Sequence, residues 1–203
     1  MSITTVVLGA GASARMGQPK QLLRFRGEAL VRRAARTALG AGLGPVVLVV
    51  GASAELVAAE VASLPIVIVP NPRWSDGMGS SIAAGVRRAP PDSRGVLIML
   101  ADQPLVDGAL LRSLARLLTE FDAAACRYGG SLGVPAAFGP CLIDRLRNLP
   151  PEAGARAVLT SPGVRLAEVS FEDAALDIDT PEDFHKFSGM ASRVNTGRAE
   201  SNR

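Results

Sequence analysis

Short apolar runs alternate along most of the chain with longer segments in which apolar residues recur every three or four positions. The short runs are rich in Val and Ile and are bounded by Gly or Pro, which is typical of buried strands. They predict strands at Thr4–Leu8, Val46–Val50, Ile66–Val69, Val96–Leu100 and Ala123–Cys126. The helical spacing of Leu and Ala predicts two amphipathic helices, at Ala29–Leu39 and Gly108–Leu118.

This order of elements favours one fold class. Strands that are apolar on both faces, separated by amphipathic helices, are typical of a parallel sheet that helices cover on both sides. We therefore expect an α/β protein with a three-layer, doubly wound fold around a mostly parallel sheet. Ligands of such folds bind beyond the carboxyl ends of the strands. Candidate chemistry should thus follow Leu8, Val69 and Leu100.

The pattern becomes less regular after Tyr128. The glycines and the proline of 129–135 predict a loop that enters a short strand at Ala136–Phe138. The rest of the fold should consist of two short helices, a strand and a final helix, at Cys141–Leu146, Gly154–Leu159, Val164–Val169 and from Pro181. Residues 188–203 contain almost no apolar side chain, so we expect them to form a disordered tail.

Composition and charge exclude several classes of binding partner. The net charge is +3, of which +2 falls in the tail, and no stripe of Lys and Arg with interleaved aromatics is present, so no nucleic-acid partner is expected. One His and two Cys exclude Cys/His zinc clusters and a disulfide framework, which suits a reducing cytoplasm. The apolar runs are far shorter than the roughly 20 residues that span a bilayer, so no membrane association is expected. The apolar start of the chain lacks the basic region of a signal peptide.

The first strand leads into a glycine-rich loop that ends at Lys20. The loop is not a dinucleotide fingerprint, which needs a helix at its third glycine position and an acidic residue about 20 positions later. Gly17 and Pro19 interrupt such a helix, and the second strand ends in Gly51-Ala52-Ser53. Small residues let backbone N–H groups approach phosphate oxygens, and Arg15 with Lys20 can neutralise a triphosphate. The alternative is a tight turn with two solvated cations.

These residues carry a family resemblance. The run Leu8-Gly9-Ala10-Gly11-x-Ser13-x-Arg15-Met16-Gly17-x-x-Lys20 resembles the signature loop of the MobA-like nucleotidyltransferases, and among them it is most similar to the CTP:molybdopterin cytidylyltransferases. The resemblance covers about residues 3–187. It continues through Asn71-Pro72-x-Trp74-x-x-Gly77-Met78-x-Ser80-Ser81, Asp102-Gln103-Pro104, Gly133-x-Pro135, Gly154-Ala155-Arg156 and Asp177-Ile178-Asp179-Thr180-Pro181-Glu182-Asp183.

The resemblance implies a Rossmann-like nucleotidyltransferase domain at 1–187, with a nucleotide-binding half at about 1–104 and an acceptor-binding half at about 105–187. It implies transfer of a cytidylyl group from CTP to the phosphate of a molybdopterin-type cofactor, with Mg²⁺ as the metal ion and release of pyrophosphate. A molybdoenzyme is a candidate protein partner. No histidine is required, because a phosphate monoester has a second pKa near 6 and is already an anion at neutral pH.

The resemblance also assigns roles to residues. Arg15, Lys20 and Asp102 would be catalytic, and Mg²⁺ would be held by Asp102 with Asp179, or by Asp177 in its place. The acceptor would contact Gly133, Pro135 and Arg156. The nucleotide would contact Leu8, Gly9, Ala10, Gly11, Ser13, Arg15, Lys20, Gly79, Ser80 and Ser81, where Ala10 points toward CTP. Two departures stand out, since the family usually has Ala in place of Gly9 and Gly-Asp within 151–153.

Several alternatives remain open at this point. The segment 177–183 also predicts a helix start capped by Thr180, and Ser80 or Ser81 could simply cap the helix expected at Ile82–Arg88. Trp74 could stack on a ring or pack in the core. The acceptor could be another sugar or alcohol phosphate. From other classes, the loop could serve an NAD(P)-dependent oxidoreductase, or the protein could be a non-catalytic cofactor-maturation factor.

Overall fold

The computed structural model describes residues 2–13 and 16–172. The predicted helix from Pro181 and the predicted tail lie outside these residues. The strands are β1 (Thr4–Gly9), β2 (Arg24–Phe25), β3 (Glu28–Ala29), β4 (Val46–Val50), β5 (Val67–Pro70), β6 (Val96–Leu100), β7 (Ala123–Tyr128), β8 (Ser131–Phe138) and β9 (Leu166–Ser170). The α-helices are α1 (Leu30–Ala41), α2 (Ala54–Val61), α3 (Met78–Val86), α4 (Gly108–Leu117), α5 (Ile143–Arg147) and α6 (Ala155–Leu159), and the 3-10 helices are η2 (Lys20–Leu22), η3 (Trp74–Asp76) and η4 (Pro140–Leu142).

The central sheet has the order β5-β4-β1-β6-β8-β7-β9. The pairs β4–β5, β1–β4, β1–β6 and β7–β9 are parallel, whereas β8 runs antiparallel to both β6 and β7. The expectation of a mostly parallel sheet is therefore confirmed. The carboxyl ends of β1, β4, β5 and β6 share one edge, at which the segments after these strands meet.

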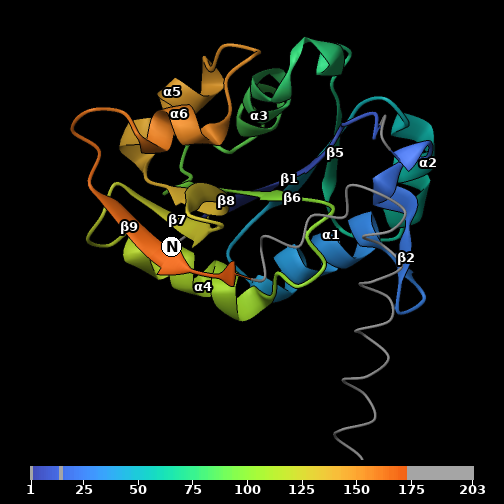
Figure 1. The fold of residues 1–203 in the computed structure, drawn as a ribbon, viewed down its shortest axis with the longest axis horizontal. Coiled ribbons are helices and arrows are strands. Elements are labelled where there is room, and N and C mark those ends of the chain that lie inside the picture. Colours follow the sequence, from blue (N-terminus) through green and yellow to red (C-terminus); the bar gives the residue numbers. More distant parts are fainter. Residues whose placement is uncertain (1, 14–15, 173–203) are drawn as a thin grey trace, which may run out of the picture.

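Helices lie on both sides of the sheet, which confirms the three-layer arrangement (Figure 1). The small helices α5 and α6 and the longer α3 lie on one side, and α1 and α4 lie on the other. Neighbouring residues of one strand serve opposite layers: Val6 packs toward α3, and Val7 packs toward α1 and α4. This alternation explains why β4 and β6 are apolar at every position.

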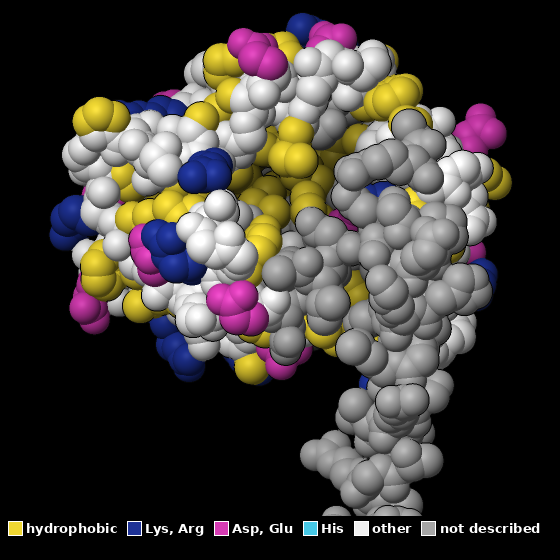
Figure 2. Space-filling model, viewed as in Figure 1, with side chains coloured by type: hydrophobic (Ala, Val, Ile, Leu, Met, Phe, Trp, Pro, Cys, Tyr) yellow, Lys and Arg dark blue, Asp and Glu magenta, His cyan; other side chains and the backbone are white. Residues whose placement is uncertain are grey.

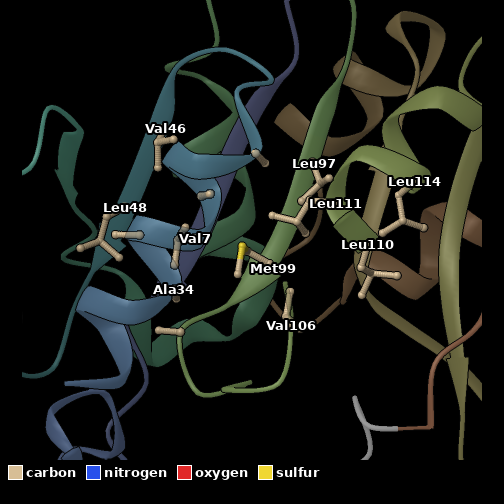
Figure 3. Packing of buried hydrophobic residues seen from close by; sticks show 14 of the residues in the cluster. Val7, Ala34, Val46, Leu48, Leu97, Met99, Val106, Leu110, Leu111 and Leu114 are labelled. Atoms are coloured by element: carbon tan, nitrogen blue, oxygen red, sulfur yellow. The ribbon is translucent and has the colours of Figure 1, made fainter. Parts of the chain in front are cut away.

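The layer that contains α1 and α4 is drawn in Figure 3. Leu110, Leu111 and Leu114 of α4 are buried against the strands, as their helical spacing predicts. Met99 of β6 and Leu48 of β4 belong to the same cluster and have no exposed surface. Fully burying one such side chain contributes about 1.5–3 kcal/mol, so this layer stabilises the sheet.

The short antiparallel pair of β2 and β3 was not predicted, and the structure differs from the sequence-based expectations in other places as well. The predicted loop at 129–135 is only a turn at Gly129 and Gly130, after which β8 begins at Ser131. Helix α3 begins at Met78, four residues before the predicted start, and ends at Val86. Helix α2 was not predicted; two of its residues, Val57 and Val61, are buried, which gives a weak periodic signal. In the described part of the chain, no helix is long and apolar enough to cross a membrane.

Candidate functional site

A cavity of about 410 Å³ opens at the edge of the sheet where β1 and β6 end. Its walls come from the first loop, from the start of α3 and from the residues after β6. On the face of the molecule shown in Figure 2, the surface is hollowed and hydrophobic side chains line the hollow. The cavity is lined by Leu8, Ala10, Gly11, Ser13, Lys20, Gln21, Trp74, Gly77, Met78, Ser81, Leu100, Ala101 and Asp102.

Two opposite charges meet in this cavity. Nζ of Lys20 lies 3.8 Å from Oδ2 of Asp102, and the side chains are 12% and 23% exposed, respectively. Lys20 follows the first loop and Asp102 follows β6, so the parallel pairing of β1 with β6 is what brings them together. Charges that are largely shielded from water interact more strongly with a ligand than charges on an open surface do.

The first loop is held closed by hydrogen bonds across its base. The backbone N–H of Lys20 donates to Oγ of Ser13 (2.9 Å), and Nε2 of Gln21 donates to the carbonyl oxygen of Gly11 (2.9 Å). Ser13 has φ 55°, a left-handed conformation that is uncommon outside glycine and that turns the chain sharply. These contacts fix Gly11, Ser13 and Lys20 relative to one another. Arg15, the second predicted cation, lies outside the described residues.

A small apolar cluster anchors the loop beneath the cavity. Met16 of the signature motif is buried with Phe25 and Leu30, and Leu105, three residues after Asp102, packs against the same cluster. The turn after β6 is also held by Nε of Arg33, which donates to the carbonyl oxygen of Pro104 (2.8 Å). The first loop, which supplies Lys20, and the turn after β6, which supplies Asp102, therefore pack on the same apolar cluster.

Asp102 is not a helix cap in the described structure. Helix α4 is capped by Asp107, whose side chain accepts from the N–H of Leu110 (2.8 Å). Asp102 lies in the turn between β6 and α4, with its side chain toward the cavity. A capping role therefore does not account for this carboxylate.

The start of α3 is organised by Asn71, which follows β5. Its buried side chain donates from Nδ2 to Oγ of Ser80 and to Oγ of Ser81, both at 2.9 Å. Neither serine caps the helix, because the N-cap residue is Gly77. Ser81 is buried and lines the cavity, whereas Ser80 is near the carbonyl oxygens of Gly77 (2.8 Å) and Arg73 (2.7 Å).

The predicted nucleotide-binding residues divide into two groups. Six of the described ones line the cavity: Leu8, Ala10, Gly11, Ser13, Lys20 and Ser81. Gly9, Gly79 and Ser80 are not among the lining residues. Gly79 permits a close approach instead, since a Cβ there would lie 2.0 Å from the carbonyl oxygen of Pro150. The N–H of Gly79 donates to the carbonyl oxygen of Pro151 (2.9 Å), so the departure from the family pattern at 151–153 lies against the start of α3.

Two of the predicted acceptor residues, Gly133 and Pro135, lie on β8, the strand next to β6, and neither lines the 410 Å³ cavity. A Cβ at Gly133 would lie 2.2 Å from the hydroxyl oxygen of Tyr128, so this glycine lets the ring of Tyr128 pack on the strand. The hydroxyl of Tyr128 and Nε2 of Gln103 both donate to the carbonyl oxygen of Val134 (3.0 Å each). The residue next to Asp102 is therefore hydrogen-bonded to the predicted acceptor strand.

The remaining predicted residues are placed as follows. Arg156 is exposed on α6 and does not line the 410 Å³ cavity. Asp177 and Asp179 lie outside the described residues. Trp74 lines the cavity and also packs against Gly51. A Cβ added at Gly51 would lie 2.7 Å from the Cβ of Trp74.

Six residues of the site were not among the predicted site residues. Gln21, Gly77, Met78, Leu100 and Ala101 line the cavity, and Asn71 positions Ser81. Gln21 directly follows Lys20, so adjacency to the motif was its available signal. Asn71 begins the family motif that ends at Ser81, but its role depends on a contact with α3 that no local pattern specifies.

The geometry of the loop also bears on the dinucleotide alternative. The first α-helix among the described residues after β1 begins at Leu30, far beyond the glycines, and β4 is followed by Gly51-Ala52-Ser53 without a carboxylate. A dinucleotide fingerprint needs a helix that opens at the glycines and an acidic residue after the second strand. The described loop has neither feature.

Cys126 does not contribute to this chemistry. It is fully buried in β7, and burial raises the pKa of its thiol to about 12. A thiol that stays protonated is a poor nucleophile and a poor metal ligand. Within the described ranges, no group of three or more His, Cys, Asp and Glu side chains is arranged to hold a metal ion.

Comparison with known proteins identifies relatives, two of which span about nine tenths of the chain. Nicotine blue oxidoreductase of Paenarthrobacter nicotinovorans is 35% identical over 91% of this chain and 95% of its own length. The purine catabolism protein PucB of Bacillus subtilis is 32% identical over 88% of this chain and 92% of its own. A probable molybdenum cofactor guanylyltransferase of Opitutus terrae is 28% identical over 68% of this chain and 67% of its own.

Solved structures with the same fold are also similar in sequence. Rv0371c of Mycobacterium tuberculosis is 30% identical and superposes with a TM-score of 0.80, covering 93% of this chain and 99% of its own. The manganese complex of the same protein superposes with a TM-score of 0.74 at 28% identity, covering 92% of this chain and 97% of its own. The family model described as the MobA-like NTP transferase domain matches residues 5–169. The chain therefore belongs to the MobA-like NTP transferases, a family of nucleotidyltransferases.

Proposed function

We propose that this protein transfers a cytidylyl group from CTP to the phosphate of a molybdopterin-type cofactor, in the presence of Mg²⁺, and releases pyrophosphate. The observation that carries the proposal is the 3.8 Å approach of Lys20 to Asp102 in one cavity at the sheet edge. Phosphoryl transfer depends on positioning and on neutralising charge at neighbouring oxygens, and a cation beside a carboxylate suits that task.

The described residues fit Mg²⁺. This ion binds one or two protein carboxylates and completes its shell with water and phosphate oxygens, so Asp102 with a bound nucleotide is an adequate donor set. Asp179 is the proposed second ligand. The manganese complex of Rv0371c supports a divalent ion in this family. When bound, Mg²⁺ would supply positive charge that polarises the α-phosphate.

Side chains and backbone groups of the protein would bind the phosphates and stabilise the leaving pyrophosphate. Lys20 would hold the β and γ phosphates and stabilise the leaving pyrophosphate, and Arg15 is proposed for the same role. Gly11 and Ser13 would let the loop backbone approach the phosphates closely. No general base is required, because the acceptor phosphate is an anion at neutral pH. Lys20 is only 12% exposed, so water screens its charge weakly.

The proposed nucleotide and acceptor rest on Ala10 and on one of the relatives. Ala10 lines the cavity, and the family resemblance at this position supports CTP. The relative named as a molybdenum cofactor guanylyltransferase supports a molybdopterin-type acceptor. Gly133, Pro135 and Arg156 would contact it, with the Gln103–Val134 hydrogen bond linking their strand to Asp102. A cytoplasmic location and a molybdoenzyme partner belong to the same proposal.

Thermal denaturation with added ligands tests the proposal. A ligand at a hundredfold excess over its dissociation constant stabilises the folded state by about 2.7 kcal/mol. CTP with Mg²⁺ should raise the melting temperature more than GTP, ATP or NADPH does. A shift with NADPH and none with any triphosphate would overturn the transferase proposal.

The second candidate function is oxidation and reduction. The relative named nicotine blue oxidoreductase, at 35% identity over almost the whole chain, is the observation that favours it. The described loop lacks the features of a dinucleotide fingerprint, so a nicotinamide cofactor would have to bind in another way. Saturable NADPH binding that CTP with Mg²⁺ does not displace would favour this candidate.

A further inference from the structure

A second cavity, of about 270 Å³, lies near the 410 Å³ cavity, which we propose binds the nucleotide and which is called the nucleotide cavity below. Ser80 lines the second cavity and Ser81, the next residue, lines the nucleotide cavity. The other walls come from the segment between β5 and η3, from the middle and the end of α3, and from the segment after α5. The lining residues are Asn71, Arg73, Ser80, Ala83, Ala84, Arg87, Asn148, Leu149 and Pro151.

The charged residues that line this second cavity are all positive. Its two charged lining residues, Arg73 and Arg87, are both cations, and no Asp or Glu is among the residues that line it. Nε of Arg73 also contacts Oδ2 of Asp76 (2.8 Å) at the rim. With Asp76 included, the group retains one net positive charge. An anion entering the cavity would therefore be attracted and would meet no lining carboxylate.

Both arginines are held in place by contacts that leave donors for a ligand. The backbone N–H of Arg73 donates to Oδ1 of Asn71 (3.0 Å), and Nη2 of Arg87 donates to the carbonyl oxygen of Arg147 (2.8 Å). A guanidinium carries five N–H donors, of which Arg73 uses its Nε–H for Asp76 and Arg87 uses one on Nη2 for Arg147. The planar fork of a guanidinium matches phosphate and carboxylate oxygens.

A hydrogen-bond chain joins the two cavities. Nδ2 of Asn71 donates to the hydroxyls of Ser80 and Ser81 at 2.9 Å each, and Asn71 is buried. A ligand that shifts Ser80 or the backbone of Arg73 would therefore act on the side chain that also holds Ser81. Buried and fully bonded polar groups transmit such a shift, because breaking one bond leaves a costly unpaired group.

We propose that this second cavity binds a small phosphate-bearing anion, and that the Asn71 hydrogen bonds communicate its presence to the nucleotide cavity. Pyrophosphate is the simplest probe, since its phosphate oxygens can accept hydrogen bonds from guanidinium groups. The proposal goes beyond cytidylyl transfer and does not depend on which nucleotide the protein uses.

Calorimetric titration of pyrophosphate tests the site without turnover. The Lys20→Ala variant serves as the starting protein, because it removes the cation of the nucleotide cavity. It should bind pyrophosphate saturably at constant ionic strength, and a further Arg87→Gln or Arg73→Gln change should weaken binding at least tenfold. Arg88→Gln is the matched control, since Arg88 is exposed and adjacent to Arg87 in the sequence but does not line the cavity. It should change binding less than twofold.

Two results would overturn the proposal. Equal weakening by Arg87→Gln and Arg88→Gln would mean diffuse attraction to a basic surface, and an absence of saturable binding in the Lys20→Ala protein would mean that the cavity holds no anion. Amide hydrogen exchange gives the location independently. Pyrophosphate should slow exchange at 78–83 in the Lys20→Ala protein and leave it unchanged after the added Arg87→Gln change, whereas slowing confined to 10–13 would place the anion in the nucleotide cavity.

Discussion

Replacing Asp102 by Asn separates the proposed metal-binding role of this carboxylate from its structural role. The substitution keeps the size of the side chain and removes its negative charge. At the 3.8 Å separation from Lys20, the gross attraction is about 4 kcal/mol for an effective dielectric constant of about 20. Desolvation and side-chain entropy offset most of that attraction in partly exposed pairs, so the net loss should be about 1 kcal/mol.

The two expected effects are therefore very different in size. A loss of about 1 kcal/mol lowers the melting temperature of a chain of this length by about 2–4 °C. Loss of the charge that retains Mg²⁺ beside the α-phosphate should reduce turnover about a hundredfold or more. Melting curves and pyrophosphate release at limiting Mg²⁺ measure the two effects on the same preparation.

A control variant removes the same charge elsewhere. Asp144 is 85% exposed and pairs with Arg147 at 3.1 Å on α5, away from the cavity. Asp144→Asn should leave both turnover and melting temperature nearly unchanged. The reasoning would be refuted by an Asp102→Asn protein that retains normal turnover at limiting Mg²⁺, or by one whose lost turnover is explained by unfolding.

Three further outcomes follow from particular contacts. Gly85→Ala should lower the free energy of unfolding by about 1–3 kcal/mol in denaturant unfolding, because the new Cβ would lie 2.5 Å from Cγ1 of buried Val6. Gly40→Ala is the control: a Cβ there would meet nothing within 4 Å, so the change should be neutral or stabilising by up to about 1 kcal/mol. Lys20→Ala should lower kcat about a hundredfold with a small change in melting temperature, and an unchanged kcat would contradict the proposed phosphate clamp. A thiol assay at pH 8 should detect exposed Cys141 in the native protein and Cys126 only after denaturation, because burial raises the pKa of Cys126 to about 12; two thiols reacting at once in native protein would contradict this.

Parts of the fold were predictable because local sequence and tertiary environment agree. The strands at Val46–Val50 and Val96–Leu100 were predicted to the residue, since each is fully apolar, lies in the middle of the sheet and follows a Gly or Pro. The start of β8 could also have been found. Gly129 and Gly130 have φ 53° and 72°, and a pair of glycines is a known signal for a two-residue hairpin turn.

The start of α3 could not be predicted in the same way. Gly79 and the serines after it have low helix propensity, which favoured a later start at Ile82. The helix begins earlier because its first turn packs against a distant segment: the N–H of Gly79 donates to the carbonyl oxygen of Pro151 (2.9 Å). That contact joins residues far apart in the sequence, so no local pattern encodes it.

The same distinction applies to the site. Lys20 and Asp102 were predictable because each follows the carboxyl end of a buried strand, and parallel strands bring such ends together. The bridge from Asn71 to Ser81 depends on how α3 packs against the end of β5. Arg15 and Asp179 remain predictions, since both lie outside the described residues.

The most direct test of the proposed function is pyrophosphate release from a single set of reactions. The protein and Mg²⁺ are incubated with molybdenum-loaded molybdopterin and each of the four ribonucleoside triphosphates in turn. Release should be fastest with CTP, should require the acceptor, and should fall about a hundredfold or more in the Asp102→Asn protein. Release that is independent of the acceptor, or no release with any triphosphate, would contradict the proposal.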